Sequence, residues 1–203
     1  VACDSNNISK VKKIISKTQN SKIKVGYKFG LEFLNSKNGR NFISKLKNKI
    51  IFGDYKFADI PNTCAKAIKS VSDLKFDYLT IHVSSGLNAL KAAKKVSGKT
   101  KLIGVTILTS LDQKLLKEIG FNKDVKKLVR HQSRLASKAK LDAIVCSAQE
   151  VKIVKKVFKK EIITPGIRLS SNKNDQKRTL TPKQAFKNGS DWLVIGRPIT
   201  KGN

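Results

Sequence analysis

Residues 53–63 carry two carboxylates and a lysine at the end of an apolar run, in the spacing Asp54-x-Lys56-x-x-Asp59. Successive side chains of a strand alternate between its two faces, so Asp54 and Lys56 are expected to point the same way, with Asp59 in the loop beyond. A lysine ammonium beside carboxylates can stabilise a developing negative charge and then donate a proton. An isolated Asp-x-Lys would more simply be a solvated strand end. Similar polar residues follow other apolar runs, which favours an acid–base site.

The elements that must position these residues alternate along the whole chain. Short apolar runs are followed by amphipathic segments, which is typical of repeated βα units around a parallel sheet. Strands are predicted at 1–3, 23–26, 50–53, 78–83, 102–107, 143–146, 162–164 and 192–195. Helical patterns occupy 61–71, 86–95, 125–139, 149–159 and 182–188. Eight strands in this alternation predict an α/β protein with a single-domain (β/α)8 barrel over residues 1–203.

In such a barrel, polar residues at the carboxyl ends of the strands are candidates for the active face. The residues that fall there are Asp4, Lys24, Asp54, Lys56, His82, Thr109, Arg168 and Arg197. His82 is left outside the catalytic set, because a hydrogen-bonded histidine at a strand end is an equally good interpretation. His131 lies in a lysine-rich helical stretch and is interpreted as a surface residue.

The longer pattern from Asp54 through Asp59-Ile-Pro-Asn-Thr63 resembles the signature of the orotidine 5'-monophosphate decarboxylase family. Further motifs follow in the family's order: Val1-Ala-Cys-Asp4, Lys24-Val-Gly26, Thr80-Ile-His82, Val105-Thr-Ile-Leu-Thr-Ser110, Asp142-Ala-Ile-Val-Cys-Ser147, Thr164-Pro-Gly-Ile-Arg168, Asp175-Gln-Lys-Arg178 and Ile195-Gly-Arg-Pro-Ile-Thr200. Together these matches span nearly the whole chain. The resemblance implies the same (β/α)8 fold.

The resemblance also implies a reaction: cofactor-free decarboxylation of orotidine 5'-monophosphate to uridine 5'-monophosphate in de novo pyrimidine biosynthesis. No pyridoxal or thiamine group would serve as electron sink, so the protein alone would have to lower the barrier, by ~20 kcal/mol. The family's array of alternating charges carries over to Lys24, Asp54, Lys56 and Asp59. In this array Lys56 would donate the proton that replaces carbon dioxide.

Substrate contacts are likewise implied by the resemblance. Asp4 and Lys24 match positions that bind the ribose hydroxyls, and Thr109 matches the position that reads the pyrimidine edge. The matches to phosphate and pyrimidine contacts are Arg168, Gln176, Gly196 and Arg197. The polar stretch 169–181 would then be a lid that closes over the substrate. The family further implies a homodimer, in which Asp59 and Thr63 enter the neighbouring subunit's site.

The formal net charge of +29 would ordinarily suggest a nucleic acid or an anionic membrane as partner. Of the 43 basic residues, however, only six are arginine, and the lysines are scattered along the chain. In residues 151–160, the lysines largely occupy the face of a helix opposite an apolar stripe. A lysine-rich composition therefore explains the charge more simply, and neither nucleic acid nor membrane is expected as a partner.

Other features of the composition fit a cytoplasmic enzyme. No apolar run approaches the roughly 18 residues of a membrane span. The three cysteines, Cys3, Cys64 and Cys146, lack metal-ligand spacing and are interpreted as reduced core thiols, so no metal site is expected. The chain contains no methionine and begins and ends close to apolar runs. We therefore expect both ends to be trimmed from a longer protein, with the closing helix after Ile199 missing.

Two other functions stay open at this point. A magnesium-dependent decarboxylase or aldolase of the same suprafamily, acting on a keto-sugar phosphate, would share Asp-x-Lys-x-x-Asp, and its activity would be lost in a chelator. A basic nucleic-acid-binding protein on a barrel scaffold would instead bind DNA or RNA with a steep salt dependence and no turnover.

Overall fold

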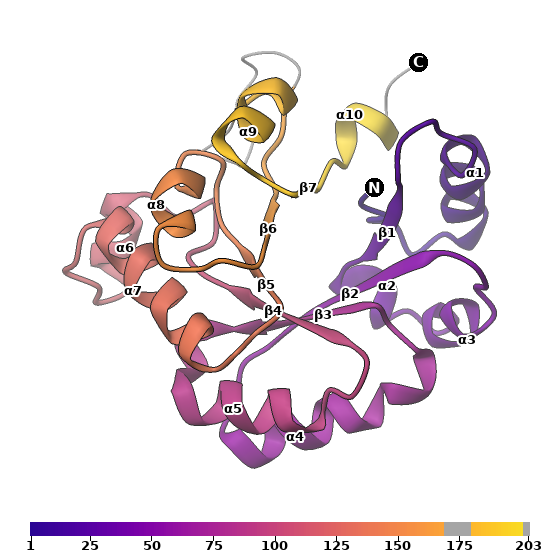
Figure 1. Ribbon diagram of the computed structural model, residues 1–203. Helices are drawn as coiled ribbons and strands as arrows, with labels where there is room; N and C mark the ends of the chain where they lie inside the picture. Colours follow the sequence, from indigo (N-terminus) through magenta and orange to yellow (C-terminus); the bar gives the residue numbers. More distant parts are fainter. Residues whose placement is uncertain (169–179, 201–203) are drawn as a thin grey trace.

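Seven parallel strands form one curled sheet in the computed structural model, which describes residues 1–168 and 180–200. The strands are β1 (Gly26–Phe29), β2 (Ile50–Phe57), β3 (Tyr78–His82), β4 (Lys101–Val105), β5 (Ala143–Val145), β6 (Glu161–Thr164) and β7 (Trp192–Leu193). Each strand pairs with the next one along the chain. Parallel neighbours need a crossover connection, and helices supply these crossovers on the outside of the sheet (Figure 1).

The first three residues close the sheet into a barrel. Ala2 forms a parallel bridge with Lys28 of β1, and the Cys3 N–H donates to the Lys28 carbonyl at 2.8 Å. On its other side, the Ala2 N–H donates to the carbonyl of Ile195, just after β7, at 2.9 Å. The segment predicted as the first strand is therefore present as a short bridge between the two edges, and the predicted α/β barrel is confirmed.

The helices surround the strands (Figure 1). They are α1 (Ile8–Thr18), α2 (Leu31–Leu34), α3 (Gly39–Ser44), α4 (Pro61–Ser70), α5 (Gly86–Val96), α6 (Gln113–Glu118), α7 (Val125–Lys138), α8 (Val151–Lys155), α9 (Pro182–Asn188) and α10 (Arg197–Thr200), with 3-10 turns η1 (Ser72–Leu74) and η2 (Val83–Ser85). Local signals set several of their starts. Pro61 and Pro182 open α4 and α9, where a missing N–H costs little, and Thr181 and Gln184 form a capping box. None of the described helices is long and apolar enough to cross a membrane.

The barrel interior is filled by one residue from each of several neighbouring strands. Its apolar cluster consists of Phe52, Tyr78, Ile103, Ala143 and Ile163, with Trp192 and Val194 packed against it. The larger cluster lies between the strands and the helices and includes Val11, Phe33, Ile68, Leu90 and Val129. This arrangement follows from the alternation of side chains along each strand, which sends successive residues into the barrel and toward the helices.

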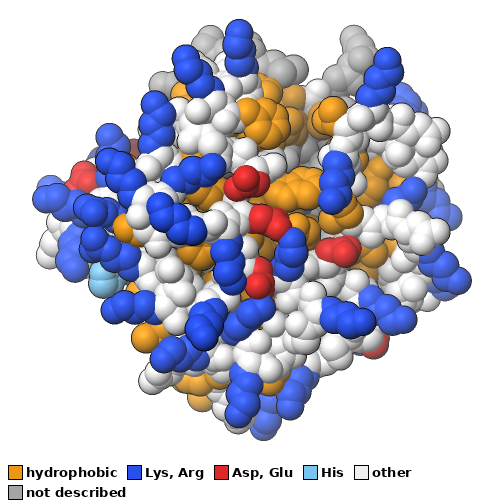
Figure 2. All heavy atoms as spheres, in the orientation of Figure 1, with side chains coloured by type: hydrophobic (Ala, Val, Ile, Leu, Met, Phe, Trp, Pro, Cys, Tyr) orange, Lys and Arg blue, Asp and Glu red, His pale blue; other side chains and the backbone are white. Residues whose placement is uncertain are grey.

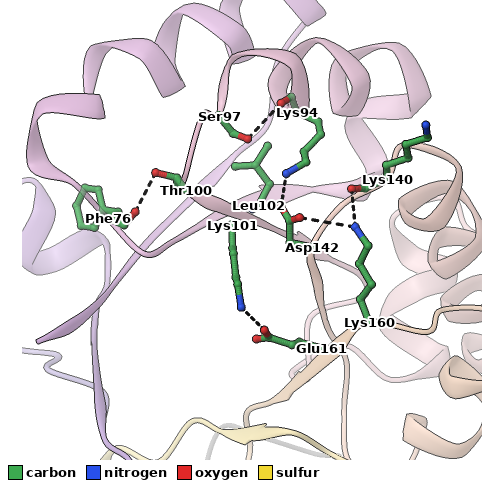
Figure 3. A network of polar contacts seen from close by, with 10 residues as sticks. All are labelled: Phe76, Lys94, Ser97, Thr100, Lys101, Leu102, Lys140, Asp142, Lys160 and Glu161. Atoms are coloured by element: carbon green, nitrogen blue, oxygen red, sulfur yellow. Dashed lines mark hydrogen bonds and ion pairs between the residues drawn. The ribbon is translucent and has the colours of Figure 1, made fainter.

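Aspartates placed immediately before β3, β5 and β7 fix the register of alternate strand pairs. The carboxylates of Asp77, Asp142 and Asp191 accept the N–H groups of Ile51, Leu102 and Ile162 at 2.7, 2.9 and 2.8 Å. Each aspartate N–H also donates to the carbonyl of the same residue. Figure 3 shows Asp142, which additionally pairs with Lys94 and Lys160. These paired hydrogen bonds therefore hold β2 to β3, β4 to β5 and β6 to β7 in register.

One predicted strand is misplaced. The strand expected at 23–26 runs instead from Gly26 to Phe29, because Ile23 is 74% exposed whereas Tyr27 and Phe29 are buried. The strand expected at 50–53 continues to Phe57, and α8 is shorter than the helix expected at 149–159. Helix α9 has the predicted bounds, and α4, α5 and α7 differ from theirs by one residue at an end.

Basic side chains cover the visible face of the molecule without gathering into one patch (Figure 2). His131, on α7, is exposed, as predicted. On this face the lysines are dispersed, as expected for a solvated surface.

Candidate active site

A cavity of about 500 Å³ opens at the carboxyl ends of the strands. Apolar side chains on β2, β4 and β5, and just beyond β4 and β7, are among those that line it: Phe52, Val105, Ile107, Val145 and Val194. The polar and charged lining residues are Asp4, Lys28, Asp54, Lys56, Thr109, Arg168 and Arg197. Charged groups therefore project into a largely apolar cavity, where electrostatic interactions are stronger than in water.

A second and more open groove of about 570 Å³ lies between α1 and α3. Lys12, Phe42 and Lys45 are among its lining residues, and its described lining contains no carboxylate. Acid–base chemistry of the kind predicted for Asp54 and Lys56 therefore belongs to the barrel cavity, not to this groove.

Asp54 lies between two lysines at the floor of the barrel cavity. Its Oδ2 atom is 2.8 Å from Lys56 Nζ and 3.1 Å from Lys28 Nζ. Lys28 Nζ also lies 3.3 Å from Asp4 Oδ1. The result is a chain of alternating charges, Asp4, Lys28, Asp54 and Lys56, in which each ammonium has a carboxylate partner.

Burial and charge act in opposite directions on this cluster. Burial alone would raise the pKa of Asp54, but Lys28 and Lys56 outweigh it and hold the pKa below its ordinary value. Burial would likewise lower the pKa of Lys28, but Asp54 and Asp4 outweigh it and raise the pKa. Both groups are therefore ionised at neutral pH, although Asp54 is only 7% exposed.

A bulge in β2 brings Lys56 to Asp54. Gly53 pairs with Leu79 and Phe57 with Ile81, so four steps along β2 correspond to two along β3. Within this bulge Lys56 has a φ of 52°, a left-handed conformation that costs a residue with a side chain about 1–2 kcal/mol. The two charged side chains do meet as predicted, but through the bulge and not by simple alternation along a regular strand.

Thr80, on β3, bonds to the first and last residues of this bulge, Asp54 and Lys56. The Lys56 N–H donates to Thr80 Oγ1 at 2.8 Å, and the Thr80 hydroxyl donates to Asp54 Oδ1 at 3.0 Å. Sequence reasoning missed Thr80 as a site residue. The available signal was a hydroxyl inside the buried strand 78–82, between Leu79 and Ile81.

The lysine predicted in the array, Lys24, lies elsewhere. It precedes β1, and its Nζ is 5.7 Å from the ring centroid of Trp192, at the start of β7. Lys28, four residues later, occupies the place next to Asp54. The error follows from the misplaced strand. The alternation of Tyr27 and Phe29 around Lys28 was the signal that could have corrected it.

The remaining predicted binding residues lie around the cavity mouth. Thr109, Arg168, Gly196 and Arg197 all line the cavity, and Arg168 Nη1 donates to the Ile167 carbonyl at 2.9 Å. Gln176 lies outside the described residues. Of the predicted lid at 169–181, only residues 180 and 181 are described.

A sequence model of the "Orotidine 5'-phosphate decarboxylase / HUMPS family" matches residues 1–203, the full chain. The chain belongs to this family.

Curated relatives in the family carry the name orotidine 5'-phosphate decarboxylase. The protein from Wolbachia sp. subsp. Brugia malayi is 45% identical over 187 residues, covering 89% of this chain and 83% of its own. The one from Coxiella burnetii (strain RSA 331 / Henzerling II) is 45% identical over 175 residues, covering 80% and 74%. A crystal structure of orotidine 5'-phosphate decarboxylase from Lactobacillus acidophilus matches with a TM-score of 0.81 and 31% identity, covering 100% of this chain and 91% of that one.

The two family residues predicted to act across a dimer lie beyond β2. Asp59 and Thr63 are exposed, and neither is among the residues that line this chain's own cavity. Asp59 Oδ1 accepts the Ile60 N–H at 2.7 Å, and Ile60 is 67% exposed. This loop is therefore available to a partner surface.

His82 lies at the end of β3, near the family's charged cluster. Burial and the positive charge of Lys56 lower its pKa. His82 is therefore neutral at pH 7. A neutral histidine adds no second positive charge beside Lys56, which fits a supporting role.

In the described part of the chain, no three His, Cys, Asp or Glu side chains gather in a way that could hold a metal ion. The three cysteines are buried and are not joined in disulfides. That the family's chemistry proceeds here without metal or cofactor stays a prediction, for which a chelator provides the test.

Proposed function

We propose that this chain decarboxylates orotidine 5'-monophosphate to uridine 5'-monophosphate, without a cofactor, in pyrimidine biosynthesis. The observation that carries this proposal is the buried Asp54 carboxylate held between the ammonium groups of Lys28 and Lys56 in a cavity with apolar walls. Membership of the family and relatives named for this activity support the same reaction.

Lys56 is the better placed of the two lysines to transfer a proton. Its side chain is 30% exposed and contacts one carboxylate, whereas that of Lys28 is 13% exposed and lies between two. In the reaction the bond from the ring carbon to the carboxylate carbon breaks, carbon dioxide leaves, and the electron pair stays on the ring carbon. The Lys56 ammonium stabilises this charge and donates the proton that forms the new C–H bond. Lysine then regains a proton from solvent.

Asp54 supports this step mainly by positioning. Its Oδ2 atom accepts from Lys56 and also contacts Lys28, so it fixes where both ammonium groups lie. A substrate carboxylate placed next to Asp54 would experience like-charge repulsion that disappears when carbon dioxide leaves. We assign this stress a secondary role, since a carboxylate already paired with two lysines repels an anion less than an isolated one.

The cavity offers groups for each part of the nucleotide. Its volume of about 500 Å³ is typical of small-molecule sites. Arg168, Gly196 and Arg197 at the mouth would bind the phosphate, since a guanidinium can form two hydrogen bonds with it. Thr109 would read the pyrimidine edge, and Asp4 with Lys28 would bind the ribose hydroxyls. Gln176 remains a proposed further contact from the lid.

We further propose a homodimer in the cytoplasm. The exposed loop with Asp59 and Ile60 follows β2 directly and leads into the first turn of α4, which carries Thr63, so this segment could reach a neighbouring subunit's cavity while its own Lys56 stays in place. Buried cysteines that are not joined in disulfides agree with a reducing compartment.

The test is the loss of orotidine 5'-monophosphate absorbance in the presence of a chelator, for the unmodified chain and for Lys56→Ala. Lys75→Ala is a matched control, because Lys75 also has a positive φ, of 50°, but is exposed and lies outside the cavity. Turnover that survives the chelator and Lys75→Ala but is lost in Lys56→Ala supports the proposal. No turnover by the folded protein would overturn it, and activity on a keto-sugar phosphate that requires magnesium would indicate the alternative chemistry.

A further inference from the structure

Thr80 is a buried polar residue in an otherwise apolar strand. It is 0% exposed, as is its neighbour Ile81, and it lies in the middle of β3. A hydroxyl in such a place is costly unless it is hydrogen-bonded. Both of its described hydrogen bonds go to the bulge of β2, one to Lys56 and one to Asp54.

The direction of these two bonds is fixed by chemistry. A backbone N–H can only donate, so the Thr80 oxygen accepts from Lys56 and its single proton is free for another partner. That proton points to Asp54 Oδ1, since an ionised carboxylate can only accept. The other oxygen, Asp54 Oδ2, forms the ion pairs with Lys28 and Lys56. One hydroxyl thus fixes the rotation of the carboxylate about its axis.

The same hydroxyl holds the backbone at the reacting lysine. Lys56 adopts its left-handed conformation within the interrupted ladder between Gly53 and Phe57. Such a conformation persists only when surrounding contacts determine it. The bond from the Lys56 N–H to Thr80 is a contact of this kind, at 2.8 Å.

We propose that Thr80 is a positioning residue for the decarboxylation: its hydroxyl sets the Asp54 carboxylate and the Lys56 backbone together, and so places the Lys56 ammonium at the ring carbon. This inference rests on the proposed function. It differs from a packing role, because a packing role depends on the volume of the side chain, whereas positioning depends on the oxygen.

Three variants separate these roles. Thr80→Val keeps the shape and removes the hydroxyl, and Thr80→Ser keeps the hydroxyl and removes a methyl group. Thr164→Val is the control, because Thr164 is also 0% exposed at the end of a strand and shares its hydroxyl with Ser190 at 2.7 Å, away from the charged cluster.

We expect Thr80→Val to lower kcat about tenfold or more with KM changed less than about threefold, because the ammonium acts in the transition state more than in binding. Thr80→Ser should keep kcat within about threefold, even if it unfolds at a lower urea concentration. The acid limb of the kcat profile should move to higher pH in Thr80→Val, since Asp54 loses a hydrogen bond to its charged form.

The outcomes are distinguishable. If the unmodified chain is active and Thr80→Val loses no more kcat than Thr164→Val, or Thr80→Ser loses as much as Thr80→Val, the positioning role is overturned while the proposed function stands. If the folded, unmodified chain does not turn over the substrate, the proposed function fails and this role fails with it.

Discussion

Asp54 Oδ2 lies 2.8 Å from Lys56 Nζ within a bulge that takes both residues out of regular strand pairing. A regular strand would also place two side chains at this spacing on one face, but it would leave their backbone bound in the ladder. The bulge instead lets the N–H of Lys56 bind a side chain on β3. Bulges commonly redirect side chains beside active sites. Within this bulge the Asp54 carboxylate binds Thr80, Lys28 and Lys56, so Asp54 holds neighbouring groups in place as well as balancing their charge.

Asp54→Asn should therefore lower kcat by at least about a hundredfold, because the neutral amide leaves the Lys28 and Lys56 ammonium groups to repel each other. Stability should fall as well, since two partly buried cations lose their shared counter-charge. Steady-state kinetics and urea unfolding measure the two effects. Asp73→Asn is the control, because Asp73 pairs with Arg40 on the exposed surface. Comparable losses of kcat in both variants would contradict the role of Asp54.

Replacing Lys28 and replacing Lys24 should have different effects on kcat/KM. Lys28→Ala should reduce kcat/KM by about a hundredfold or more, since it removes the ammonium that bridges Asp4 and Asp54. Lys24→Ala should leave kcat/KM within about threefold, because Lys24 packs over Trp192 instead. A larger loss in Lys24→Ala than in Lys28→Ala would restore the original sequence prediction and show that the charged cluster is assembled differently in the working enzyme.

The comparison of these two lysines shows what the sequence could predict. Alternating apolar runs were enough to predict the barrel, because burial on both faces of a parallel sheet leaves a strong pattern. The motif around Asp54 and Lys56 was equally visible. The start of β1 was harder to place, because Ile23 resembles a strand residue by type but is exposed in the packed structure. The alternation of Tyr27 and Phe29 around Lys28 was the weaker signal for the true strand.

The bulge could not be predicted from the sequence, and Thr80 was marked only by a hydroxyl inside an apolar strand. Nothing in the local sequence of β2 requires a left-handed residue at position 56, since lysine has no preference for that conformation. The backbone N–H of Lys56 bonds to a partner 24 residues away, a contact that the local sequence does not reveal. The aspartates before β3, β5 and β7 also leave only a weak trace, because a lone aspartate before an apolar run looks like an ordinary loop residue.

The stability of the chain should depend on His82 in mildly acidic solution. Burial and Lys56 lower the folded-state pKa of His82, so the unfolded chain binds a proton at higher pH than the folded one. Stability is therefore highest above the ordinary histidine pKa and falls as pH decreases through it. Urea midpoints at about pH 7.5 and about pH 5.5 should differ more for the unmodified chain than for His82→Gln.

His131→Gln is the control for this pH effect, since the chain has two histidines and His131 is exposed on α7. It should keep the pH dependence of the unmodified chain. If His131→Gln flattened the dependence and His82→Gln did not, the half-buried His82 would not be its source.

The contribution of the register-fixing aspartates to stability can be tested at Asp142, which lies outside the cavity. Asp142→Ala should lower the free energy of unfolding by about 2–3 kcal/mol, because the buried Leu102 N–H loses its side-chain acceptor and Lys94 loses its partner at 2.5 Å. Asp142→Asn keeps an acceptor for Leu102 and should cost about 1 kcal/mol. Both variants should retain kcat. A loss of kcat without a loss of stability would show that this network acts on the site.

Gly30 tests how tightly the cavity holds the pair of Asp4 and Lys28. A Cβ at position 30 would lie 3.1 Å from Asp4 Oδ1 and 3.4 Å from Lys28 Nζ, so these groups would have to shift by a few tenths of an ångström. Gly30→Ala should therefore raise KM by about three- to tenfold through the proposed ribose contacts, with a smaller change in kcat. Gly26→Ala meets an equally close neighbour, Ile50 Cγ2 at 3.1 Å, but at the opposite end of β1. It should affect stability and leave KM unchanged. Equal KM values for both variants would mean that the pair of Asp4 and Lys28 does not contact the substrate.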